Sequence, residues 1–192
     1  DDAIGASMLA EFSAYGVAAA LSRRFAGCVS PVSAVLVDGA GERMIVNYVD
    51  PALPVATEWL PEIPDGVGAV LGDVRWPEGS AAMLAKAKAR GLPAILDGDL
   101  PGCSPELLAS ATLVAFSAGG LARTTGEGAI EAGLRRAATM CEAQAMATDG
   151  ANGVFWLEGG RLAHCPAFAV RAVDTLGAGD VFHGALAVAL AE

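Results

Sequence analysis

Basic residues are scarce in this sequence, which has 12 Lys and Arg against 22 Asp and Glu and a formal net charge of −10. Non-specific binding to nucleic acid or to an anionic membrane depends on basic patches, so the composition argues against both partners. A small anionic substrate stays open, because a few well-placed Arg side chains can bind one. No apolar run reaches the roughly 18 residues of a membrane span, and no basic-then-apolar leader opens the chain. The sequence therefore predicts a soluble cytoplasmic protein.

Closely spaced cysteine pairs are also missing. The chain has four cysteines that are far apart in sequence: Cys28, Cys103, Cys141 and Cys165. Without a Cys-x-x-Cys pair, neither a metal site nor a disulfide framework is expected, and we predict buried, reduced thiols. His164 and His183 have no ligand partner at metal spacing, so we interpret both as structural residues.

Apolar residues follow helical and extended patterns in alternation. Helical spacing is found at 2–15, 77–90, 128–140 and in the last residues, whereas short apolar segments typical of strands occupy 32–37, 44–48, 68–72, 93–96, 113–116, 145–148, 153–157 and 161–165. The pattern predicts an α/β fold in which a mostly parallel sheet is covered by helices on both faces. Two β-hairpins are expected, turned at Asp38–Gly41 and Glu158–Gly160. The length suits one domain over residues 1–192.

Polar residues follow the predicted parallel strands at the points where these strands end. They are Asp73, Arg75, Asp97, Asp99, Thr148 and the turn Gly177–Gly179. Functional residues of open α/β sheets gather at the carboxyl ends of the strands. We therefore expect the active site at this edge of the sheet.

The last residues run from a glycine-rich turn straight into an Ala/Leu helix. Backbone N–H groups of Gly177, Ala178 and Gly179, together with the positive end of the helix, are suited to hold a phosphate. Asp180, at the start of the helix, is placed to take a proton from an attacking hydroxyl. An ordinary strand-to-helix connection has a similar pattern, so this turn alone leaves both interpretations open.

The full run Asp174–Asp180, DTLGAGD, followed by a Phe-x-Gly helix resembles the signature of the ribokinase-like (PfkB) carbohydrate kinases. Similar segments are spread over the whole chain: DDAIG, GERMIVNY, ILDGD and TDGANG. Within the family, GERMIVNY, EWLPEI, GDVRW, ILDGDL and FSAGGLARTTG together look especially like the kinases of 6-deoxy-6-sulfofructose. The resemblance implies a ribokinase-like fold with residues 32–48 as part of a small β lid, through which a homodimer is possible.

The resemblance also implies an activity that depends on ATP and Mg²⁺. Asp180 would deprotonate the C1 hydroxyl of 6-deoxy-6-sulfofructose, and the turn Gly177–Gly179, including Ala178, would be the anion hole for the transferred phosphoryl group. Thr148 and Gly150, with Thr175, would bind the nucleotide. For Thr148 and Gly150, a strand-ending loop without ligand contact is the alternative. The metal ligands are not assigned.

Two residues correspond to positions that contact the sulfonate in sulfofructose kinases, namely Asn47 and Arg75. An Arg fork and an amide donor suit the three oxygens of a sulfonate. The alternative is that Asn47 caps the hairpin and that Arg75 pairs with Asp73 or Asp97.

The sequence departs from the family in two respects. Ser117–Gly120 stands on the loop where the family commonly has Asn-x-x-Glu, and Ala118 replaces a Glu that helps to hold magnesium-linked water. Relative to the family, the chain also lacks an N-terminal and a C-terminal segment, so we expect an incomplete domain that alone binds ATP poorly. Two other functions stay open: a kinase of the same family acting on fructose or another ketose or ketose phosphate, and a non-catalytic protein that binds a sugar or a nucleotide.

Overall fold

The computed structural model describes residues 1–37 and 43–192. Two compact units make up the chain, Asp1–Val55 and Ala56–Glu192. The turn predicted at Asp38–Gly41 lies outside the described residues.

The first unit begins with α1, Ala3–Ala14. Asp2 caps this helix: its Oδ1 accepts hydrogen bonds from Gly5 N at 2.7 Å and from Ser30 Oγ at 2.8 Å. The helix ends at Tyr15, and Gly16 follows with φ 73°, as the sequence predicted. The apolar face expected on this helix is largely exposed, since Ile4, Met8 and Phe12 each keep more than two fifths of their surface in water.

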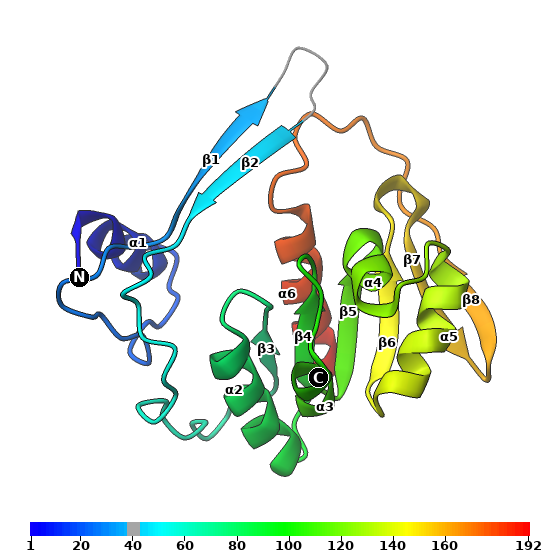
Figure 1. Ribbon diagram of the computed structural model, residues 1–192, viewed down its shortest axis with the longest axis horizontal. Coiled ribbons are helices and arrows are strands. Elements are labelled where there is room, and N and C mark those ends of the chain that lie inside the picture. Colours follow the sequence, from blue (N-terminus) through cyan, green and yellow to red (C-terminus); the bar gives the residue numbers. More distant parts are fainter. Residues whose placement is uncertain (38–42) are drawn as a thin grey trace. The chain divides into compact units, whose positions relative to one another are not determined.

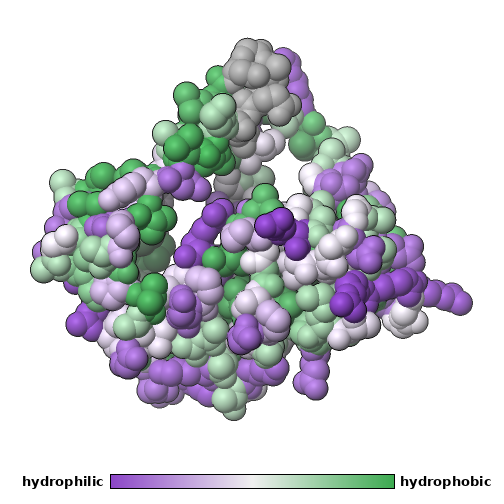
Figure 2. Space-filling model, viewed as in Figure 1, coloured by the Kyte–Doolittle hydropathy of each residue, from purple (hydrophilic) through white to green (hydrophobic). Residues whose placement is uncertain are grey.

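Two antiparallel strands complete the first unit, β1 (Val32–Val37) and β2 (Arg43–Tyr48) (Figure 1). Both strands were predicted. All described side chains of the pair are exposed, and hydrophobic surface is visible along the hairpin (Figure 2). A two-stranded sheet with so much exposed apolar surface is marginally stable in isolation.

The second unit is built on a six-stranded sheet of order β3-β4-β5-β6-β7-β8 (Figure 1). Its strands are β3 (Val70–Gly72), β4 (Ala94–Gly98), β5 (Leu113–Ser117), β6 (Gln144–Thr148), β7 (Val154–Glu158) and β8 (Arg161–Cys165). Neighbours from β3 to β6 are parallel, and the last two pairs are antiparallel. The predicted mostly parallel sheet is confirmed, and Gly159 and Gly160, both with positive φ, form the predicted turn between β7 and β8.

Helices cover both faces of this sheet. They are α2 (Pro77–Ala89), α3 (Pro105–Ser110), α4 (Ala118–Thr125), α5 (Ile130–Met140) and α6 (Ala178–Ala191), with a short 3₁₀ helix, η1, at Gly150–Asn152. Side chains alternate along the strands, so that Leu96 and Phe116 face a core shared with α2 to α5. Ile95 and Ala115 face the other side and pack against α6.

Two helices of the second unit were not predicted, α3 and α4. The first spans only 6 residues, too few for a periodic pattern. The second occupies the stretch that was expected to be a loop after the strand, because Ser117 ends β5 and caps α4 at the same time.

The cysteine prediction is partly wrong. All four cysteines are free, yet only Cys28 is buried, and Cys165 is exposed because β8 lies at the edge of the sheet. Among the described residues, no helix has both the length and the apolar character needed to cross a bilayer.

Candidate active site

The first turn of α6 lies at the carboxyl end of the parallel strands. Gly177 precedes the helix with φ 75°, a left-handed conformation that favours glycine. Before it, Leu176 N donates to Asp174 Oδ1 at 2.8 Å, and Ala178 N donates to Thr175 O at 3.2 Å. Among the described residues, no side chain caps α6 at Gly177, and the N–H groups of a helix's first turn have no partner within the helix. This turn can therefore bind an anion through its N–H groups and the positive end of the helix.

Asp180 occupies the third position of α6, and its carboxylate is exposed. A Cβ built on Gly177 would lie 3.7 Å from Asp180 Oδ2, so the carboxylate stays beside the open N–H groups. A base and an anion site are thus presented side by side.

Asp180 also lines a pocket of about 370 Å³. The other lining residues come from β3, the segment after β3, α2, β4 and α6: Leu71, Gly72, Asp73, Trp76, Ser80, Asp97 and His183. The predicted gathering of Asp73, Asp97 and the α6 turn at one edge of the sheet is confirmed. The pocket is rich in carboxylates, and the buried His183 also lines it.

Burial raises the pKa of the Asp97 carboxyl above its usual range. His183 opposes this effect, while the negative charges of Asp99, Asp73 and Asp180 reinforce it. Asp97 Oδ2 lies 3.2 Å from His183 Nδ1.

A second group of contacts joins β4, β5 and α4 beside the pocket. Ser117 Oγ donates to Asp99 Oδ1 at 2.7 Å and accepts from Gly120 N at 2.9 Å. Only glycine fits at position 120, because a Cβ there would lie 1.9 Å from the carbonyl oxygen of Gly98. The stretch Ser117–Gly120 is therefore a helix start packed directly on the end of β4, and not the loop that the sequence analysis expected.

Arg75 lies after β3, where its backbone N–H donates to Asp73 Oδ1 at 2.9 Å. Its guanidinium is 3.9 Å from Asp99 Oδ2. The ion-pair partner is therefore Asp99, whereas the sequence had suggested Asp73 or Asp97. The Arg75 side chain is 59% exposed. A long ion pair at the surface is weak, which leaves the guanidinium available to an anionic ligand.

Asn47 belongs to the first unit, within β2. It faces Ser33 of β1, whose Oγ donates to Asn47 Oδ1 at 2.7 Å. Asn47 thus makes a cross-strand contact instead of capping the hairpin, and its amide N–H₂ group is not used in this bond.

The residues predicted to bind the nucleotide do not line the pocket that contains Asp180. Thr148 ends β6, and its Oγ1 donates to Phe116 O at 3.3 Å. Gly150 starts η1 with φ 49° and is exposed. Thr175 is exposed two residues before Gly177.

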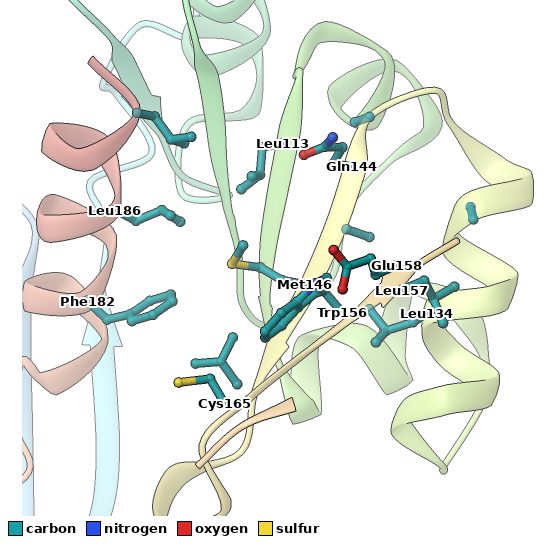
Figure 3. A pocket seen from close by; sticks show the side chains of 15 residues that line it. Leu113, Leu134, Gln144, Met146, Trp156, Leu157, Glu158, Cys165, Phe182 and Leu186 are labelled. Atoms are coloured by element: carbon teal, nitrogen blue, oxygen red, sulfur yellow. The ribbon is translucent and has the colours of Figure 1, made fainter. Parts of the chain in front are cut away.

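A larger cavity of about 640 Å³ lies on the same face of the sheet as α6. Figure 3 shows Phe182 and Leu186 of α6 pointing toward Met146 and Trp156 across this space. Its lining is mainly apolar and contains none of the predicted site residues. The chemistry therefore belongs to the smaller pocket.

Comparison with known proteins assigns the chain to a family. The profile of the pfkB family carbohydrate kinases matches residues 1–192. The chain belongs to this family.

Solved structures of similar fold include three sugar kinases or kinase-like proteins. A ribokinase-like protein of Agrobacterium tumefaciens is 33% identical, with a TM-score of 0.83, over 100% of this chain and 64% of its own length. Arabidopsis thaliana ribokinase complexed with ribose and ATP is 24% identical, with a TM-score of 0.64, over 83% of this chain and 55% of its own. Vibrio cholerae O395 fructokinase with bound fructose, ADP and calcium is 22% identical, with a TM-score of 0.76, over 100% of this chain and 68% of its own. The last two show the fold alone.

This PfkB-family chain thus spans 64% of the length of the Agrobacterium protein. In the described part of the chain, no group of three or more His, Cys, Asp or Glu side chains is arranged to hold a metal ion.

The contacts that His183 and Ser117 make beside this PfkB-family pocket were not predicted from the sequence. His183 was interpreted as structural, although it follows Asp180 by three residues and so lies one helical turn further along α6. That spacing was the available signal. Ser117 was treated as part of a loop, although a Ser after an apolar strand is a common helix cap.

Proposed function

We propose that the complete protein containing residues 1–192 is an ATP-dependent kinase that phosphorylates the C1 hydroxyl of 6-deoxy-6-sulfofructose. The observation that carries the proposal is the first turn of α6, where the exposed Asp180 carboxylate lies beside a helix start that no described side chain caps. Family membership supports the reaction class. One protein of this fold binds ribose and ATP and another binds fructose and ADP, which is consistent with a sugar and an adenine nucleotide as ligands.

In this reaction Asp180 takes the proton of the C1 hydroxyl, and the oxygen attacks the γ-phosphorus of ATP. The new bond forms between the sugar oxygen and phosphorus, the bond to the β-phosphate oxygen breaks, and ADP leaves. The N–H groups of Gly177, Ala178 and Gly179 stabilise the negative charge on the transferred group. Thr148, Gly150 and Thr175 hold the nucleotide, and Mg²⁺ neutralises part of its phosphate charge when bound.

The sulfonated sugar is favoured over fructose because Arg75 presents an exposed guanidinium at the edge of the sheet, where its described ion pair is the 3.9 Å contact with Asp99. A guanidinium fork suits a sulfonate, and Asn47 offers an amide donor of the kind expected at such a site. We also propose that residues 1–192 form one kinase domain, in which β1 and β2 belong to a lid, and that the protein is a homodimer.

The first test is ADP release by the complete protein with MgATP and, side by side, 6-deoxy-6-sulfofructose, fructose 6-phosphate and fructose. We expect a strong preference for the sulfonated sugar. Asp180→Asn should lower kcat by about 10² to 10⁴, the range for a positioned base, while ATP still binds.

Each other outcome has a definite meaning. A preference for fructose would retain the kinase and discard the sulfonate site. Silence with all three sugars, and an Asp180→Asn protein with unchanged behaviour, would favour a non-catalytic sugar- or nucleotide-binding protein.

A further inference from the structure

His183 is the buried ionisable side chain of the site. Its exposed fraction is 5%, and Ser110 is the other buried polar residue in the described part of the chain. It lies on the face of α6 that also carries Phe182 and Leu186, which pack toward the sheet. Both ring nitrogens of a histidine in such a place need partners, since a buried polar group without one is costly.

Two neighbouring strands supply these partners. His183 Nε2 lies 3.2 Å from the carbonyl oxygen of Ala115 in β5, and Nδ1 lies 3.2 Å from Asp97 Oδ2 in β4. The ring therefore bridges α6 to both strands one helical turn after Asp180. The Nδ1 contact is not aligned as a hydrogen bond, so its strength is electrostatic.

These contacts fix the protons on the ring. A carbonyl oxygen only accepts, so Nε2 must carry a hydrogen. In a neutral ring, the unprotonated Nδ1 would place its negative partial charge 3.2 Å from a carboxylate oxygen, and the two atoms would repel. A second proton removes the repulsion. We place this proton on Nδ1 because the carboxylates of Asp73, Asp97 and Asp180 line the same pocket and favour a positive charge on the ring.

The surrounding charges favour the same state. Asp97, Asp73, Asp99 and Asp180 all contribute negative charge here, whereas the Arg75 guanidinium is exposed and lies 3.9 Å from Asp99. An imidazolium at position 183 would thus be a buried counter-ion to these carboxylates. Such a positive charge would also favour the binding of a negatively charged nucleotide nearby.

We propose that His183 is a positioning residue of the phosphoryl-transfer site, which as an imidazolium ties the start of α6 to Asp97 and Ala115 and so fixes Asp180 and the anion hole. The proposal rests on the proposed function. Its physical basis is that a small misplacement of a base or an anion hole greatly slows a reaction, even when the substrate still binds.

The protonation state is tested by ¹⁵N NMR of the histidines in the complete protein at a pH of about 8, with His183→Gln to assign the signal. We expect both ring nitrogens of His183 to be protonated. In Asp97→Asn, Nδ1 should lose its proton, because the amide N–H of the new side chain can donate to a neutral ring. A wild-type Nδ1 without a proton would overturn the proposal, whether or not the protein is a kinase.

Kinetics test the positioning. His183→Gln can still donate to Ala115 O, but it turns an amide oxygen toward Asp97, so kcat should fall by about 10² while KM for the sugar changes less than ~3-fold. Adding Asp97→Asn supplies a donor to that oxygen and should restore kcat at least ~10-fold. His164→Gln, away from the pocket, is the matched control and should keep wild-type kcat.

Three kinetic results count against the proposal. A His183→Gln protein with wild-type kcat would show that His183 does not position the site. A fall in kcat that Asp97→Asn does not reverse would show that His183 is merely a structural residue. A wild-type protein that is inactive with every sugar would refute both the proposed function and the positioning role. The NMR result would still show whether Nδ1 of His183 carries a proton. If His183→Gln does not fold, the His183 signal is assigned as the one that loses a ring proton in Asp97→Asn, and the absence of such a signal overturns the proposal.

Discussion

At the residue scale, Arg75 separates the two sugar substrates. Arg75→Ala should lower kcat/KM for 6-deoxy-6-sulfofructose by about 10- to 100-fold, because a hydrogen bond to a charged group contributes about 1.5–3 kcal/mol. For fructose, which has no sulfonate, the value should change less than ~3-fold. Steady-state kinetics of the complete protein measure both. Arg161→Ala, on the far edge strand β8, controls for the loss of a positive charge, and equal losses for the two sugars would contradict the assignment.

Cys103 gives a prediction that depends on no substrate. Burial raises the pKa of its thiol to about 11, so its reactive thiolate is scarce at a pH of about 8 and becomes common only as the pH approaches 11. Iodoacetamide at that lower pH should therefore modify the exposed Cys165 and spare Cys103. Peptide mass spectrometry after timed alkylation measures the two rates. Unfolding in urea should make the rates equal, and equal rates in the folded protein would refute the effect of burial.

At the scale of elements, long or strongly patterned segments could be predicted and short ones could not. The sheet strands were visible as apolar runs, and α2 was bounded by Pro77 and by Gly91 with φ 71°. In contrast, α4 has only Leu121 as a buried large side chain, so no apolar period marks it. This helix depends on the Ser117 cap and on the close approach of Gly120 to Gly98, which is a contact between elements.

The candidate site likewise has one part that could be predicted from the sequence and one part that could not. The turn Gly177–Gly179 and Asp180 are adjacent in sequence, so their arrangement follows from one local motif. The contacts of His183 with Asp97 and Ala115 join residues 68 or more positions apart. No local pattern contains them, since they depend on which face of α6 packs against which strands. Asp99, the ion-pair partner of Arg75, was not predicted for the same reason. Its carboxylate is held by Ser117, which lies at the end of a neighbouring strand and is distant in sequence.

At the scale of the whole molecule, the β1–β2 hairpin has two different faces. Cross-strand pairing places Leu36 opposite Met44 on one face. That face also carries Val32, Val46 and Tyr48, all exposed. The opposite face also has exposed apolar side chains, Val35, Val37 and Ile45, but it differs by the polar pair Ser33 and Asn47. Because an exposed apolar face of this kind marks an interaction surface, we assign the apolar face to a second copy of the protein and leave the Asn47 face to the lid.

The homodimer is tested by sedimentation of the complete protein and two matched variants. Wild type should sediment as a dimer, and Leu36→Asp should sediment as a monomer because it places a charge in the apolar face. Val35→Asp introduces the same charge on the Asn47 face of the same strand, so it should remain dimeric. Dissociation by both variants would show that the hairpin itself had been disrupted, and a monomeric wild type at all concentrations would refute the dimer.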